Sequence, residues 1–200
     1  MKRIAFFDFD GTLTRRDTFW DFNVLFFGRR RVTAALIELT AAVLSSLRFD
    51  RSFIKEKFVS ILWTGISYES YISFARRYAS REIEKNLLPV AMKVFLSHIG
   101  HGDDVYIVTA SMKDWCEFWA KRYGVPVIGT ELEVSDGYLT GHLSTPNCRG
   151  REKVARIRAV VDLSGYSRIF AYGNSNGDRE MLSIADEAVY RWDRIPDIER

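Results

Sequence analysis

Short apolar runs alternate with helical stretches over the second half of the chain, and this alternation most constrains its fold. After Gly102, strand-like runs such as Val105–Val108 and Ile169–Ala171 are separated by segments with helical character, such as Lys113–Tyr123 and Lys153–Val161. A succession of this kind predicts a parallel sheet whose crossover connections are helices. We therefore expect an α/β fold.

The first strand candidate stands far from the others in the chain, which predicts a large insertion. Ile4–Phe9 is an apolar run that ends at an Asp-Gly turn, whereas residues 17–99 look helical. If the first run joins the same sheet, the helical stretch rises from its carboxyl end. The 200 residues, 47% of them hydrophobic, are enough for one domain of this kind. We expect a core of residues 1–14 and 100–200 and an all-helical cap of residues 15–99.

Two carboxylates stand at the end of the first strand, in the segment FFDFDGTLT. Asp8 and Asp10 are two residues apart, so their side chains can share one face of the chain. The carboxyl end of a parallel strand is where open α/β sheets bind ligands. Two carboxylates so close repel each other, which favours a bound cation or a shared proton. The alternative is an ordinary Asp-Gly turn, in which Gly11 allows the bend and the second aspartate is incidental.

Three later segments carry polar side chains at the end of a predicted strand or the start of a predicted helix. Thr109–Ser111 ends a strand at a helix start, where backbone N–H groups and a hydroxyl can hold a phosphate oxygen, although a plain helix cap also fits. Lys153 opens a helix and, taken alone, is compatible with a solvated surface lysine. Asn174 and Asp178 follow another strand, either as hard oxygen ligands suited to Mg²⁺ or as a polar turn that caps a helix.

Taken together and in this order, the four segments resemble the haloacid dehalogenase superfamily over nearly the whole chain. The resemblance is closest to the phosphoserine-phosphatase-like branch, subfamily IB, whose helical cap is inserted between the first and second motifs. It implies a three-layer, Rossmann-like α/β core with a parallel sheet. It also implies a phosphoric monoester hydrolase that works with Mg²⁺.

The resemblance further implies a role for each motif residue. Asp8 corresponds to the nucleophile and Asp10 to the general acid/base, whose backbone carbonyl binds Mg²⁺. The implied metal site consists of Asp8, Asp10, Asn174 and Asp178. The family usually has an aspartate where this chain has Asn174; the amide brings no negative charge, so we expect weaker metal binding, and direct coordination by Asn174 stays open. The remaining residues are expected to bind the phosphate and the rest of the substrate: Gly11, Thr12, Asp17, Thr109, Ala110 and Lys153.

These roles describe the hydrolysis of a phosphomonoester through a covalent intermediate. Mg²⁺ and Lys153 neutralise the phosphate, Asp8 attacks phosphorus to give an aspartyl-phosphate, and Asp10 protonates the leaving alkoxide before it activates water. A halide leaving group needs neither the proton nor Mg²⁺, so dehalogenation is disfavoured. Mutase or phosphotransfer chemistry uses the same residues and stays open. So does a non-catalytic phosphate-binding module, which the amide of Asn174 suggests.

The insertion carries the signals about substrate. Asp17 lies nine positions after Asp8, in the place where phosphoserine phosphatases have a glutamate that binds the substrate's amino group; a helix cap is the alternative. Val32–Leu47 is apolar and follows Arg29–Arg31, but a membrane span needs ~20 apolar residues. The segment therefore fits a helix in the core of the cap, or one that rests on a membrane surface with its arginines at the headgroups.

Charge and cysteine content narrow the expected partners and location. The formal net charge is only +3, so we do not expect the strongly basic surface that binds nucleic acid. Cys116 and Cys148 have no CxxC spacing, and Asp8 and Asp10 interrupt the first apolar run too early for a signal peptide. We expect a cytoplasmic protein, peripheral at the membrane if the cap touches lipid. Its expected substrate is a small phosphorylated metabolite, or a phospholipid if the cap is similar to that of a phosphatidylglycerophosphatase; the oligomeric state is open.

Overall fold

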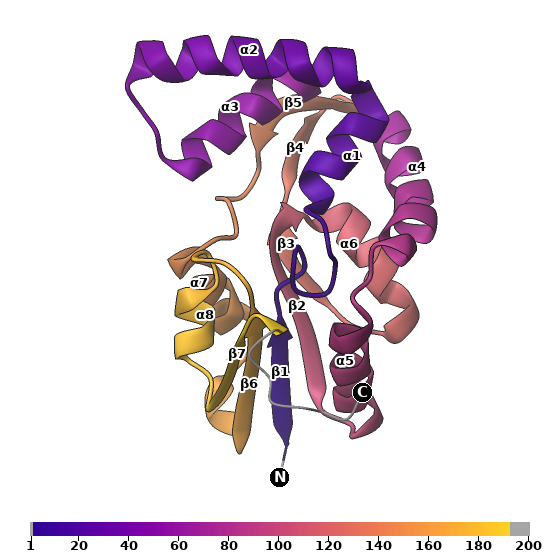
Figure 1. Ribbon diagram of the computed structural model, residues 1–200, viewed down its shortest axis with the longest axis vertical. Helices are drawn as coiled ribbons and strands as arrows, with labels where there is room; N and C mark the ends of the chain where they lie inside the picture. The colour runs from indigo at the N-terminus through magenta and orange to yellow at the C-terminus, as the bar shows by residue number, and fades with distance from the viewer. Residues whose placement is uncertain (1, 193–200) are drawn as a thin grey trace.

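A five-stranded parallel sheet forms the centre of the molecule in the computed structural model, which describes residues 2–192 (Figure 1). The strands lie in the order β3-β2-β1-β6-β7, so the first strand of the chain is the middle one. Ile4 of β1 is paired in register with Asp104 on one side and with Ile169 on the other. The strand bounds are β1 Arg3–Phe7, β2 Asp104–Met112, β3 Val127–Thr130, β6 Arg168–Gly173 and β7 Glu187–Tyr190.

Helices cover both faces of this sheet because its middle strand is apolar on both sides. Along β1, Ala5 and Phe7 belong to one apolar core and Ile4 and Phe6 to the other, and all four side chains are fully buried. An apolar run without alternation is typical of a parallel strand covered on both faces. One face carries α5 (Pro89–Gly100) and α6 (Lys113–Ala120), and the other carries α7 (Arg151–Val160) and α8 (Arg179–Ser183).

Four further helices and a two-stranded hairpin stand above the carboxyl edge of the sheet (Figure 1). Helices α1, α3 and α4 each begin after an aspartate or serine whose side chain accepts hydrogen bonds from first-turn amides: Asp17, Asp50 and Ser67. The bounds are α1 Thr18–Phe27, α2 Arg29–Ser46, α3 Arg51–Trp63, α4 Tyr68–Tyr78, β4 Leu132–Ser135 and β5 Tyr138–Leu143. Within residues 2–192, no helix has both the length and the apolar character needed to cross a bilayer.

Aromatic side chains join this upper layer to the sheet layer. The ring of Phe22 in α1 stacks on that of Trp115 in α6, with 4.2 Å between centroids, and also meets the ring of Trp63 in α3. All three side chains are buried. Stacked and edge-on aromatic pairs contribute beyond the area they cover, so this cluster fixes the upper helices over the edge of the sheet.

The α/β fold class with a parallel sheet is confirmed. The division into a core of residues 1–14 and 100–200 and a cap of residues 15–99 stays a prediction, and two elements pack across it: α5 packs on β2, and the hairpin packs on α3. Thr109–Ser111 lie near the end of β2, just before α6 begins at Lys113, as expected. The strand is longer than the apolar run Val105–Val108, and its register against β3 is irregular after Val108.

Candidate active site

The turn after β1 presents Asp8 and Asp10 at the carboxyl edge of the sheet. The backbone carbonyl of Phe9 accepts hydrogen bonds from three amides of the turn, at 2.9 to 3.2 Å. Gly11 has a φ of 73°, in the left-handed region that favours glycine. A β-carbon on Gly11 would lie 1.9 Å from the side-chain nitrogen Nδ2 of Asn174. Glycine at this position therefore also allows the loops after β1 and β6 to approach each other.

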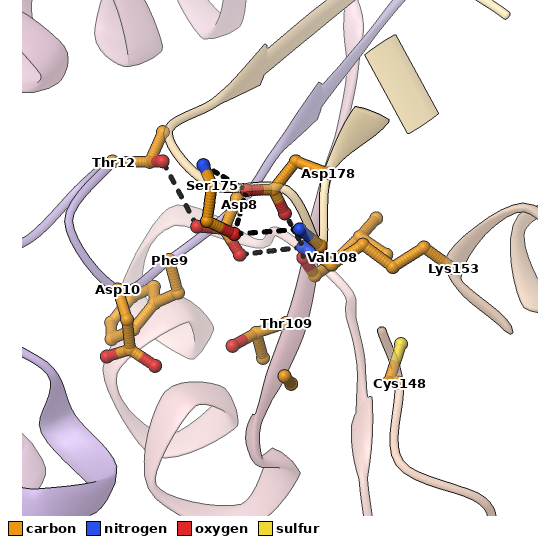
Figure 2. Close-up of polar contacts among 12 residues, drawn as sticks. Asp8, Phe9, Asp10, Thr12, Val108, Thr109, Cys148, Lys153, Ser175 and Asp178 are labelled. Carbon is orange, nitrogen blue, oxygen red and sulfur yellow. Dashed lines mark hydrogen bonds and ion pairs between the residues drawn. The ribbon is translucent and has the colours of Figure 1, made fainter. Parts of the chain in front are cut away.

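Asp8, Lys153 and Asp178 form a buried charge cluster (Figure 2). The ammonium of Lys153 donates to Asp8 Oδ1 at 2.7 Å, to Asp178 Oδ1 at 2.6 Å and to the carbonyl of Val108 at 2.6 Å. Thr12 donates to the second oxygen of Asp8 at 3.1 Å. The lysine side chain is only 1% exposed, and a buried charge is tolerated when it is paired and fully hydrogen-bonded. The cluster therefore holds the Asp8 carboxylate in one position.

The second oxygen of Asp178 organises the loop after β6. Oδ2 accepts hydrogen bonds from the amide and hydroxyl of Ser175, at 2.9 and 2.8 Å, and from the amide of Asn174 at 3.2 Å. Gly173 packs directly on this aspartate, since a β-carbon there would lie 2.6 Å from its Cβ. Both carboxylate oxygens of Asp178 are thus engaged, and the residue links Lys153 to the loop that carries Asn174.

Burial and pairing together set the charge state of the cluster. Burial raises the pKa of Asp8 to about 7, against the lowering effect of Lys153. Burial also disfavours the charged form of Lys153, but the carboxylates of Asp8 and Asp178 raise its pKa above the ordinary value. For Asp178, burial opposes ionisation, yet Lys153 and the hydrogen bonds from Ser175 lower its pKa. Near neutral pH the lysine and Asp178 are therefore charged, while Asp8 is close to its midpoint.

Asp10 is held by groups outside this cluster. Its Oδ1 accepts a hydrogen bond of 2.7 Å from the amide of Thr18, the first residue of α1, and its Oδ2 accepts one from the hydroxyl of Ser111. Burial raises the pKa of Asp10 to about 6, and the charge of Asp17 adds to this, while the hydrogen bonds from Ser111 and Thr18 lower it. A carboxyl group with such a pKa can give and take a proton near neutral pH.

One pocket of about 320 Å³ brings most of the predicted site residues together. It is lined by the following of them: Asp8, Asp10, Gly11, Asp17, Ala110, Lys153, Asn174 and Asp178. Thr12 and Thr109 are buried and do not line it; Thr109 Oγ1 accepts a hydrogen bond of 3.0 Å from the amide of Ser111. Asp17 lines the pocket and also caps α1, so the helix-cap alternative is observed for this residue.

Four cationic side chains at this site escaped prediction from the sequence: Arg15, Arg51, Lys55 and Arg149. Lys55 reaches from α3 to the sheet layer, where its ammonium donates to the carbonyl of Ala110 and, at 3.2 Å, to Asn147. A signal for two of them exists. Arg51, Lys55 and Phe58 are spaced by four and three residues, which places them on one side of a helix. Arg149 lies in a loop and leaves no periodic signal.

Oxygen atoms around the pocket fit a hard cation. Among the described residues, no three acidic, histidine or cysteine side chains are arranged to hold a metal ion. However, the carbonyl of Asp10 and the side-chain oxygen of Asn174 accept no hydrogen bond within residues 2–192, and both residues line the same pocket as Asp8. One carboxylate with two neutral oxygens is a donor set that Mg²⁺ accepts. The two oxygens of Asp178 are occupied by Lys153 and the Ser175 loop instead.

Known proteins resemble this chain in sequence and in structure. The chain matches the family model of haloacid dehalogenase-like hydrolases over residues 5–183. Protein CicA of Caulobacter vibrioides is 36% identical over 200 residues, which cover 92% of this chain and 84% of that protein. The histidinol-phosphatase of Neisseria meningitidis serogroup C is 24% identical over 207 residues, covering 94% and 90%. A solved phosphoserine phosphatase, described as a phospho-aspartyl intermediate analogue, is similar with a TM-score of 0.67 at 18% identity, covering 94% of this chain and 86% of that one.

Proposed function

The chain belongs to the haloacid dehalogenase-like hydrolase family, and on that premise we propose that it hydrolyses a phosphomonoester with Asp8 as nucleophile and Asp10 as general acid and base. The resemblance to this family and to its phosphoserine-phosphatase-like branch is confirmed. Its class, phosphoric monoester hydrolase, is confirmed by the family match together with a relative named histidinol-phosphatase. The residue roles, the use of Mg²⁺ and the substrate belong to our proposal.

The observation that carries the proposal is the restraint of both oxygens of Asp8. Lys153 binds one oxygen at 2.7 Å and Thr12 the other at 3.1 Å, at the wall of an open pocket. A carboxylate fixed in this way is oriented for attack before the substrate arrives. The lysine also supplies positive charge where an incoming phosphate dianion would otherwise be repelled.

The proposed reaction consists of two displacements at phosphorus. In the first, an oxygen of Asp8 forms a bond to phosphorus while the bond from phosphorus to the alcohol oxygen breaks, and Asp10 gives its proton to the departing alkoxide. In the second, water attacks the phosphorus of the aspartyl-phosphate and Asp10 takes up a proton from that water. Inorganic phosphate leaves, and the Asp8 carboxylate and the Asp10 proton are restored.

Asp8, the backbone carbonyl of Asp10 and Asn174 are the groups that would hold Mg²⁺. When bound, the ion adds positive charge against the phosphate oxygens. The chain's own part is to fix the Asp8 carboxylate beside the other two donors, through its hydrogen bonds from Lys153 and Thr12.

Substituting Asp8→Asn tests the proposal, because it keeps the shape of the side chain and removes the nucleophile. With Mg²⁺ and an aryl phosphate, we expect turnover to fall by roughly a thousandfold or more. Asp162→Asn is the matched control, since Asp162 caps a short turn outside the pocket. Undiminished turnover in Asp8→Asn would overturn the proposal. A wild-type protein that binds inorganic phosphate but shows no turnover at any Mg²⁺ concentration would instead be a non-catalytic phosphate-binding module.

An exposed apolar surface favours a second candidate, a membrane-associated lipid phosphatase. Four apolar side chains of α2 and the turn after it are strongly exposed: Ile37 (70%), Leu44 (60%), Leu47 (76%) and Phe49 (62%). Arg29–Arg31 stand at the start of the same helix. Exposed apolar groups next to arginines are complementary to a membrane surface that contains anionic lipid.

Co-sedimentation with vesicles tests this second candidate. We expect the wild type to pellet with vesicles that contain phosphatidylglycerol and not with phosphatidylcholine alone. Replacing Arg29–Arg31 by glutamine, or Ile37 and Leu44 by serine, abolishes this binding, whereas Leu96→Ser, at an exposed site on α5, leaves it intact. A wild type that stays in the supernatant, or that buries this face in a dimer, contradicts membrane binding.

A further inference from the structure

Two pockets under the upper helices lie next to each other and share lining residues. The polar pocket described above contains Asp8 and Lys153. An adjoining pocket of about 260 Å³, here called the leaving-group pocket, shares five lining residues with it: Asp10, Asp17, Arg51, Ala110 and Arg149. If the reacting phosphate lies beside Asp8, the alcohol that carries it extends into the leaving-group pocket.

The leaving-group pocket has an apolar wall. Side chains of α1, α2 and α3 build it: Phe19, Trp20, Leu39, Ile54 and Phe58. The rings of Trp20 and Phe58 lie 4.9 Å apart in an edge-to-face arrangement, and Trp20 remains 41% exposed. An apolar wall of this kind gains free energy when a ligand displaces water from it.

Two arginines stand where this apolar wall meets the polar pocket. Arg51 and Arg149 line both pockets, and neither forms an ion pair within residues 2–192. The guanidinium of Arg149 lies over Gly177, where a β-carbon would come within 2.4 Å of it, so the glycine makes room for this side chain. Guanidinium groups bind carboxylate and phosphate oxygens in a bidentate manner.

Arg15 lines only the polar pocket, and most other charged groups of the two pockets are already engaged. Lys153 is bound by its two carboxylates, and Lys55 donates to a backbone carbonyl and to Asn147. Asp10 accepts hydrogen bonds on both oxygens, and Asp17 caps α1 through Oδ1 alone. The two arginines outweigh the single negative charge of Asp17, so the net charge offered to a ligand beside the apolar wall is positive.

We propose that the substrate is a phosphomonoester whose alcohol carries both an apolar body and a second anionic group. The body would rest on Trp20 and Phe58, and the anion, a carboxylate or a phosphate ester, on Arg51 and Arg149. This inference rests on the proposed function and names its substrate class. A small polar alcohol such as serine leaves the apolar wall in contact with water and is disfavoured.

Four phosphates of secondary alcohols separate the effect of an apolar ring from the effect of a carboxylate. Isopropyl phosphate has neither, phospholactate has only the carboxylate, phenylisopropyl phosphate has only the ring, and phosphorylated phenyllactate has both. For the wild type, we expect the ring and the carboxylate each to raise kcat/KM by about tenfold. Equal kcat/KM on all four, or a preference for isopropyl phosphate, overturns the inference while the phosphatase activity itself stands.

Variants of the protein test which residue produces each gain in kcat/KM. Arg51→Gln lowers kcat/KM for the two carboxylate substrates about tenfold more than for the other two. Trp20→Ala removes the gain from the ring and keeps the gain from the carboxylate. Arg158→Gln, an exposed arginine of α7, is the control for loss of charge alone. An equal loss on all four substrates in Arg51→Gln would mean that this arginine holds the reacting phosphate, and would overturn its assignment.

Binding separates failure of this inference from failure of the proposed function. If no Asp8-dependent turnover is found on any of the four compounds, the proposed function fails. Calorimetric dissociation constants of the same four compounds with Asp8→Asn then decide the inference alone. Tightest binding of phosphorylated phenyllactate supports it, and equal binding of all four overturns it.

Discussion

Replacing Lys153 by methionine tests how the buried charges hold the site together. The substitution keeps the length of the side chain and removes an ammonium that donates three hydrogen bonds of 2.6 to 2.7 Å. Asp8 and Asp178 are then buried carboxylates without a counterion. Removing one partner of a buried ion pair costs about 3–5 kcal/mol, and we expect a loss of unfolding free energy in this range at high pH.

The loss depends on pH because Asp8 titrates near neutrality. In the wild type its pKa is about 7, and Lys153 lowers it; without the ammonium, the folded variant keeps that proton to higher pH. The unfolded chain, with an ordinary pKa of 3.8, has already lost the proton. Since only the folded variant then binds the proton, its unfolding free energy falls by about 1.4 kcal/mol per pH unit. The deficit relative to the wild type is smaller at pH 6, where both folded proteins hold the proton, than at pH 9.

Urea unfolding followed by tryptophan fluorescence, in the presence of a chelator, measures this difference at the two pH values. Lys113→Met is the matched control, since Lys113 forms a partly exposed pair with Glu131 at 3.2 Å, worth about 0–1 kcal/mol. A deficit of Lys153→Met that is equal at pH 6 and pH 9, or larger at pH 6, would refute the reasoning.

Three further predictions concern the turn, the acid and the metal. Ser111→Ala removes a hydrogen bond that lowers the pKa of Asp10, so the alkaline limb of the kcat/KM profile moves to higher pH; an unmoved limb contradicts Asp10 as the acid. Gly11→Ala places a β-carbon against Asn174 and adds roughly 1–2 kcal/mol of strain from the left-handed backbone conformation, so urea denaturation shows lower stability and assays show lost activity. Normal activity of this variant contradicts the close approach of the loops after β1 and β6. Asn174→Asp adds a negative charge beside Asp8, so less Mg²⁺ is needed for half-maximal activity, and a chelator abolishes activity until Mg²⁺ is restored. An Mg²⁺ requirement equal to that of the wild type contradicts a metal-facing role of Asn174.

Much of the fold could be predicted because its signals are local. The apolar run that begins at Ile4 predicts a buried strand, and the alternation after Gly102 predicts the parallel sheet. The irregular register of β2 against β3 after Val108 could not be predicted, because it depends on the pairing of two separate strands in the tertiary fold. The packing of α5 on the sheet and of the hairpin on α3 likewise depends on partners far away in sequence.

In the candidate site too, some residues have a local sequence signal and others depend on distant contacts. Asp8, Asp10 and Asp178 could be placed together because each follows a strand, and parallel strands end at one edge of the sheet. The burial of Lys153 has no local signal, because its carboxylate partner Asp8 is 145 residues away. Lys55 depends on how the upper helices sit over the sheet, which helical spacing alone does not determine.

Trapping the covalent intermediate tests the central claim most directly. The protein is quenched rapidly during turnover and treated with borohydride, which reduces an aspartyl-phosphate to homoserine, and peptide mass spectrometry then locates the reduced residue. We predict reduction at Asp8 and none at Asp10 or Asp178. Reduction at another aspartate, or full turnover with Asp8 never modified, would contradict the account.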